Sequence, residues 1–85
     1  MPRYYLHLYL PGSLGFVEDE EGSELANLDR ARAEAVAGVR SILSDDVKAG
    51  RIDLRGRIEV ADAQGAVILL LPFCEAVELL TESPA

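Results

Sequence analysis

The stretch from Asn27 to Gly50 constrains the fold most, because it is the one segment long and periodic enough to form a multi-turn helix. Its apolar residues recur at the i, i+3, i+4, i+7 spacing that gathers them in one sector of a helical wheel. Asn27 can cap the first turn through its side-chain oxygen, and Gly50 is placed to end the last turn. The sequence therefore predicts an amphipathic helix that covers one side of a small core. Its apolar sector holds Leu28, Ala31, Ala35, Val39, Ile42 and Leu43.

The side of the helix that faces its support carries small residues, Ala31, Ala35 and Gly38. Small side chains let a helix approach a sheet closely, and a glycine inside a helix often has a packing reason, since it lowers stability by about 1 kcal/mol relative to alanine. We therefore expect close packing at Gly38.

The first segment, Arg3 to Leu10, alternates in the manner of a strand with two different faces. Pro11, Gly12, Ser13 and Gly15 then form a turn that permits a hairpin to a short strand, Phe16 to Asp19. The acids from Glu18 to Glu21 suit an edge strand, where charge discourages pairing with another molecule. Gly22 to Ala26 is read as the lead into the helix.

A second hairpin follows the helix. Arg57 to Asp62 alternates, with Ile58 and Val60 inward, and Ala66 to Phe73 returns after a turn at Ala63, Gln64 and Gly65. The returning strand is apolar on both faces, which is expected of a strand that is covered on both sides. Pro72 places its end at an edge or a bulge, and Ile52 and Leu54 are expected to plug the loop beneath the helix.

The order strand, strand, helix, strand, strand predicts a two-layer α+β fold, a four-stranded antiparallel sheet with one long helix on one face. Residues 1–80 form the single domain and residues 81–85 a flexible tail. One helix covers only one face of the sheet. If side chains alternate regularly between the two faces along each strand, here called parity, the residues that share the second face are Tyr5, His7, Tyr9, Ile68 and Leu70.

Charge and cysteine content narrow the class of protein. Fifteen acidic against eight basic residues give a formal net charge of −7, whose field repels phosphate backbones and anionic membranes, so we expect neither nucleic acid nor membrane as a partner.

The longest apolar run, Ala66 to Leu71, is far short of the roughly 20 residues that span a bilayer. Cys74 is the single cysteine, which excludes an internal disulfide, and Met1 to Leu10 is too brief for a secretion signal. We expect a cytoplasmic protein.

Several short motifs follow one another along the chain: Met1-Pro2-Arg3-Tyr4-Tyr5 with His7-Leu8, Asp19-Glu20-Glu21-Gly22 with Glu24-Leu25, Ala31-Arg32-Ala33-Glu34-Ala35, Gly56-Arg57-Ile58-Glu59-Val60 with Asp62 and Gly65, and Leu71-Pro72-Phe73. In this order they resemble a family of small bacterial proteins, a domain-of-unknown-function family common in alphaproteobacteria. The resemblance covers nearly the whole chain and implies no activity. Leu6 departs from it, standing where an aromatic residue is frequent, and so does Tyr9-Leu10-Pro11, which replaces a more polar turn.

No catalytic, cofactor-binding or metal-binding residue is predicted. His7 is a candidate for proton transfer, but its neighbours on the strand face, Tyr5 and Tyr9, offer only phenols. If Gly22 is aligned with the glycine at the sixth position of a calcium-binding loop, Val17 falls at the first position, where a carboxylate is required. Cys74 has no basic neighbour in the sequence to activate it.

Three roles are open for the second sheet face. It can be the core of a protein interface, a surface on which bases stack, or a face that the C-terminal Ala76, Val77, Leu79 and Leu80 fold over. The favoured function is a non-catalytic interaction module that self-associates through its sheet, a homodimer or a larger assembly.

Two alternatives to self-association remain. One is an acidic antitoxin-like neutraliser of a basic protein partner, since the topology is similar to the partial fold of HicB-type antitoxins, although the DNA-binding parts often appended there are absent. The other is a small enzyme that uses His7.

Overall fold

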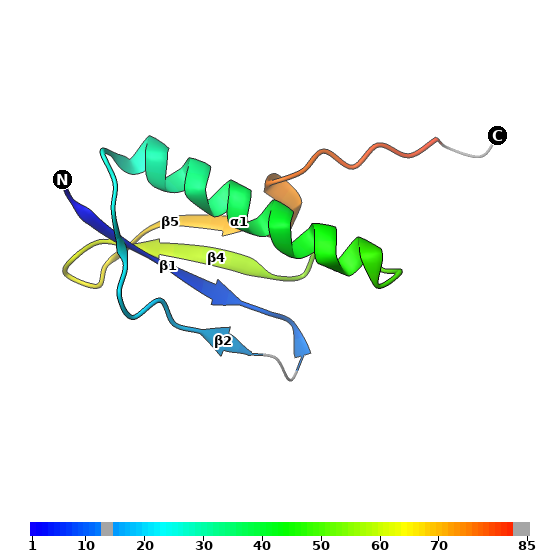
Figure 1. Cartoon of the computed structure of the whole chain (residues 1–85), viewed down its shortest axis with the longest axis horizontal. Coiled ribbons are helices and arrows are strands. Elements are labelled where there is room, and N and C mark those ends of the chain that lie inside the picture. The colour runs from blue at the N-terminus through cyan, green and yellow to red at the C-terminus, as the bar shows by residue number, and fades with distance from the viewer. Residues whose placement is uncertain (13–14, 83–85) are drawn as a thin grey trace.

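The computed structural model describes residues 1–12 and 15–82 and confirms the predicted α+β class, one helix packed on an antiparallel sheet (Figure 1). Ser13 of the predicted turn and residues 83–85 of the predicted tail lie outside the described residues. The elements in chain order are β1 (Arg3–Tyr9), β2 (Phe16–Val17), β3 (Ser23–Glu24), α1 (Leu28–Lys48), β4 (Arg57–Ala61), β5 (Val67–Pro72) and the 3₁₀ helix η2 (Phe73–Glu75).

The sheet has five strands, with β2, β1, β4 and β5 side by side in that order and every pair antiparallel. The fifth strand, β3, also pairs with β1. It lies opposite Arg3 and Tyr4, whereas β2 lies opposite Leu8 and Tyr9. Two short strands thus share one edge of β1, one at each end. The path β2-β1-β4-β5 matches the four predicted strands, and β3 is an addition that the sequence did not indicate, because two paired residues are too few to show an alternating pattern.

The helix α1 forms as its sequence predicts. Asn27 Oδ1 accepts a hydrogen bond from the backbone N–H of Arg30 at 2.9 Å, and Gly50 follows the last turn with φ +91°. The buried residues of α1 are Ala31, Ala35, Val39 and Leu43. The expectation of close packing at Gly38 was wrong. A Cβ atom there would lie 3.9 Å from Ile58 Cδ1, an ordinary van der Waals contact.

The core lies between α1 and the sheet, centred on β4 and the end of β5. Phe73 in η2 is its largest fully buried side chain, and a Cβ atom at Gly56 would come within 2.7 Å of that ring. Leu54 packs against this core as predicted, but Ile52 is 57% exposed, so its predicted role as a plug was wrong. The buried cluster is Tyr4, Ala31, Ala35, Val39, Leu43, Ile58, Val60, Leu71, Phe73 and Ala76.

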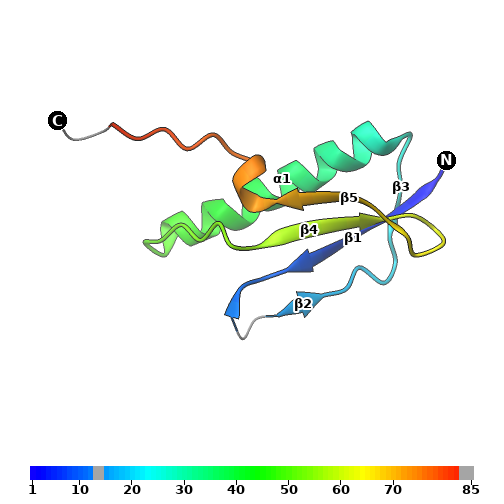
Figure 2. The same ribbon diagram turned by 180° about the vertical axis from the view of Figure 1, so that it is seen from behind.

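The chain after η2 stays on the helix side of the sheet. Arg40 Nε in α1 donates a hydrogen bond to the carbonyl oxygen of Ala76 at 2.8 Å, and the Ala76 side chain belongs to the core. Figures 1 and 2 both show the following residues running away from the sheet, and Leu79 and Leu80 are 62% and 78% exposed. The alternative in which this segment covers the second face is therefore wrong, because the segment docks on the opposite side.

Candidate functional site

The face of the sheet that α1 does not cover, here called the open face, carries a row of aromatic rings. Tyr5, His7 and Tyr9 of β1 are half-buried on it. Phe16 of β2, which pairs with Tyr9, extends the row, with ring centroids 4.6 Å apart for Tyr9 and Phe16, 5.7 Å for His7 and Phe16, and 6.4 Å for Tyr5 and His7. Phe16 is not among the predicted interface residues, although the register of the first hairpin places it opposite Tyr9.

A charged pair divides the open face. Arg57 and Glu59 of β4 lie opposite Tyr9 and His7. The Arg57 guanidinium carbon is 4.0 Å from the centre of the Tyr9 ring, and Arg57 Nε donates to Glu59 Oε2 at 3.0 Å. Because Glu59 also lies opposite Leu70, this pair separates the aromatic row from the apolar side chains of β5. The five predicted interface residues therefore form two strips rather than one patch.

The second strip lies on β5, an edge strand of the sheet. Ile68 is 40% exposed and Leu70 50% exposed, and residues 66–72 contain no charge. Phe73 N–H donates to the carbonyl oxygen of Gly56 at 3.0 Å, and since backbone groups alternate in antiparallel strands, those of Leu70 point away from β4. Pro72 lies at this edge, as predicted, and a register shift near Ile68 limits the free stretch to the middle of β5.

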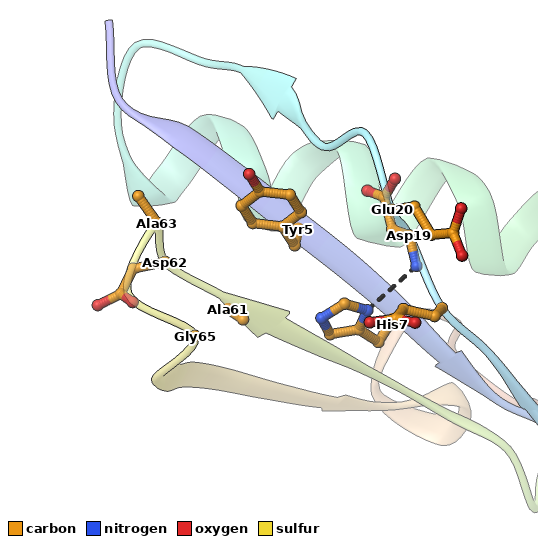
Figure 3. Close-up of a pocket in the computed structure, with 9 residues that line it drawn as sticks. Tyr5, His7, Asp19, Glu20, Ala61, Asp62, Ala63 and Gly65 are labelled. Atoms are coloured by element: carbon orange, nitrogen blue, oxygen red, sulfur yellow. Dashed lines mark hydrogen bonds between the residues drawn. The ribbon is translucent and has the colours of Figure 1, made fainter.

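Between β2 and β3, the Asp19 side chain accepts hydrogen bonds from backbone N–H groups that have no strand partner there. Its Oδ2 accepts from the backbone N–H of Leu6 and its Oδ1 from that of Gly22, both at 3.0 Å. The Asp19 N–H donates to His7 Nδ1 at 3.1 Å, as Figure 3 shows, so the neutral His7 ring carries its proton on Nε2. The predicted strand thus pairs only over Phe16–Val17. The signal that the sequence analysis missed is the Asp-x-x-Gly spacing typical of a side chain that closes a turn.

A pocket of about 400 Å³ opens on the same face, with Tyr5 and His7 between two walls (Figure 3). One wall is the segment from Glu18 to Glu20. The other is the hairpin that joins β4 and β5, where Ala61, Asp62, Ala63 and Gly65 line the pocket. No sequence signal indicated this pocket, because its walls come from two loops that meet only in the folded chain.

The clearest electrostatic perturbation lies elsewhere, in the loop between α1 and β4. Hydrogen bonds from Arg55, first from its side chain and then from its backbone N–H, lower the pKa of Asp53 to about 2. The Arg55 side chain is 76% exposed and the Asp53 side chain 22% exposed, so the pair is a surface ion pair and does not mark a reactive site.

The described residues contain no set of three or more His, Cys, Asp and Glu side chains that could hold a metal ion. Cys74 is an exposed free thiol. Nor does any helix of the part of the chain that the structure describes have the length and apolarity to cross a membrane. The site is therefore defined by a sheet face and a pocket.

This fold and site define a small two-layer α+β domain with a sheet face that no segment of its described residues covers. A scan against protein families matches residues 3–74 to the domain of unknown function DUF6894, and the chain belongs to this family. The match runs from β1 to η2 and confirms that the chain belongs to a domain-of-unknown-function family. Searches of curated proteins and of solved structures each found no match. These comparisons support neither the antitoxin-like function nor an enzyme that uses His7.

Proposed function

We propose that this protein is a non-catalytic interaction module that self-associates through its sheet as a homodimer. The observation that carries the proposal is the contrast between the two sheet edges. The edge formed by β2 and β3 carries Glu18, Glu20, Glu21 and Glu24, and charge protects an edge from pairing. The β5 edge carries no charge and exposes Ile68 and Leu70.

Two copies of β5 can pair antiparallel about a two-fold axis. Such an interface is formed by the same residues in both copies. The outward backbone groups of Leu70 supply the hydrogen bonds, and the Ile68 and Leu70 side chains of both copies become neighbours on the joined sheet. An 85-residue chain buries a small core, so a partner subunit adds apolar burial that one chain lacks.

Sedimentation equilibrium of the full chain tests this proposal. We expect a concentration-dependent mass that approaches twice 9.2 kDa. Leu70→Lys places a charge at the pairing edge and should give a monomer. Leu79→Lys is the matched control, since Leu79 is 62% exposed outside the sheet, and it should leave the dimer intact. A monomer at every concentration, or equal loss with both variants, contradicts the proposal.

The proposed setting is the bacterial cytoplasm. A single cysteine suits a reducing compartment, and the ordered motifs resemble small bacterial proteins. The partner is a second copy rather than nucleic acid or a membrane, since a formal net charge of −7 repels phosphate groups.

A further inference from the structure

The pocket that Tyr5 and His7 line has no lining residue from β5, so it remains available whether or not two copies pair. We propose that this pocket binds an arginine side chain from a segment of a partner protein. Binding at this pocket does not require self-association. It depends on the stacked rings, on the charge of one pocket wall, and on an arginine that the same face already binds.

The pocket offers a flat aromatic surface. The Tyr5 and His7 rings are nearly parallel, with an interplanar angle of 14° and centroids 6.4 Å apart. Figure 3 shows both rings on the open face, with the Asp19 loop on one side and the Ala61 to Gly65 hairpin on the other. A planar guanidinium group stacks on such rings through cation–π attraction, which is strongest where water is partly excluded.

The same face already binds a guanidinium group in this way. Arg57 lies 4.0 Å above Tyr9 while its Nε reaches the Glu59 carboxylate at 3.0 Å. The pocket repeats that combination of ring and carboxylate at the other end of the aromatic row, but it has no cation of its own among its lining residues. Arg3, on the same strand, is held by the Glu21 carbonyl oxygen and the Glu24 carboxylate.

The charge of the pocket selects a cation. Glu18 and Glu20 line one wall, are exposed, and have no salt-bridge partner among the described residues. Both oxygens of Asp19 are used by backbone N–H groups, and Asp62 Oδ1 accepts from Gln64 and Ala66. Glu18 and Glu20, together with Oδ2 of Asp62, are therefore the acceptors that the described residues leave to pair with an incoming guanidinium.

The shape of the pocket favours a side chain carried by a protein segment over a small free cation. The pocket is open to solvent, with a volume of about 400 Å³, so a lone guanidinium group would leave much of it unfilled. Backbone and neighbouring side chains of a segment can fill the rest and contact both walls. Arginine suits the site better than lysine, because its planar fork can stack and donate to two carboxylates at once.

The test is a titration of the full-length, ¹⁵N-labelled protein with a short peptide of Gly and Ser around one central Arg, followed by amide shifts. The matched ligand replaces Arg by citrulline, which keeps the planar shape and removes the charge. We expect shifts at Tyr5, His7 and the Ala61 to Gly65 hairpin with the Arg peptide, and none with the citrulline peptide. Equal binding of both peptides overturns the proposal.

Two double variants separate the pocket from general acidity. Glu18→Gln with Glu20→Gln should weaken binding by about three- to tenfold, the range for two exposed charges. Glu78→Gln with Glu82→Gln removes the same charge from the C-terminal segment and should leave binding unchanged. Equal weakening by both pairs overturns the proposal. Free arginine or spermidine binding as tightly as the peptide overturns the assignment to a protein segment.

Discussion

At the scale of single residues, Asp19 joins its loop to β1 and to Gly22 through three hydrogen bonds. Its carboxylate accepts from the backbone N–H groups of Leu6 and Gly22, so one side chain satisfies groups that a longer strand would otherwise pair. Asp19→Ala leaves both N–H groups without this acceptor, and we expect the free energy of unfolding to fall by about 1–3 kcal/mol. Urea denaturation measures the change.

The control for Asp19 is its neighbour. Glu20→Ala removes a carboxylate that is exposed and accepts no hydrogen bond from the described residues, so it should change stability by less than about 0.5 kcal/mol. If Asp19→Ala is as mild as Glu20→Ala, the loop between β2 and β3 does not depend on the Asp19 carboxylate.

Alanine substitutions at Gly22 and Gly65 separate the cost of a positive φ from the cost of a steric clash with neighbouring atoms. Both have positive φ, +69° and +85°. A Cβ atom at Gly22 would lie 2.8 Å from the Tyr5 ring and 2.9 Å from the Tyr4 carbonyl oxygen, whereas one at Gly65 would contact nothing within 4 Å. Gly65→Ala should therefore lower stability by about 1–2 kcal/mol, and Gly22→Ala by about 1–3 kcal/mol more.

Thermal or urea unfolding of the two alanine variants gives the comparison directly. Equal losses would mean that the Tyr5 ring and the loop move aside without a penalty. In that case the pocket floor is more adaptable than its stacked geometry indicates.

At the scale of elements, the sequence predicted those whose signals are local. The length of α1, its Asn27 cap and its buried stripe follow from a 3.6-residue period repeated over several turns. Strand β3 could not be predicted, because it consists of two residues and pairs with a strand about twenty residues earlier in the chain. The position of Ala76 was missed for a similar reason, since Arg40 binds its carbonyl oxygen across 36 residues of chain.

The helix contains one residue that its packing does not require. Gly38 has room for a methyl group, with the nearest non-local contact at 3.9 Å from Ile58 Cδ1. Since alanine favours a helix over glycine by about 0.8–1 kcal/mol, Gly38→Ala should raise the free energy of unfolding by roughly that amount. The midpoint of urea denaturation should rise while its slope stays constant. A lower midpoint would show that α1 lies closer to β4 than this contact indicates.

At the scale of the whole molecule, the alternation of side chains along β1 predicted that Tyr5, His7 and Tyr9 share a face, but not how the open face is arranged, and a register shift interrupts the alternation on β5 near Ile68. Tyr5, His7 and Tyr9 alternate on β1, and Leu70 lies opposite Glu59 on the same face. What parity could not give is the order of the strands, which places Arg57 and Glu59 between the aromatic row and β5. It also could not give the pocket, because both of its walls are loops whose approach depends on the complete fold.

The two proposed interactions should respond to salt in opposite directions. Each copy carries a formal net charge of −7 while the β5 edge is uncharged, so pairing through β5 brings together two molecules that repel each other. Raising ionic strength from about 0.01 M to about 0.15 M shortens the screening length from roughly 30 Å to about 8 Å, which should strengthen self-association. Binding of the arginine peptide depends on attraction to Glu18 and Glu20 and should weaken over the same range.

Sedimentation equilibrium and the peptide titration, run in the same buffers, measure both responses on one sample. The variants assign each response to its contact: Leu70→Lys should abolish self-association and leave peptide binding unchanged, and Glu18→Gln with Glu20→Gln should weaken peptide binding and leave self-association intact. If self-association weakens with salt, charged pairs hold the copies together, and the uncharged β5 edge is not the contact. If peptide binding is insensitive to salt, stacking alone holds the peptide, and the carboxylates of the pocket wall have no part in selecting a cation.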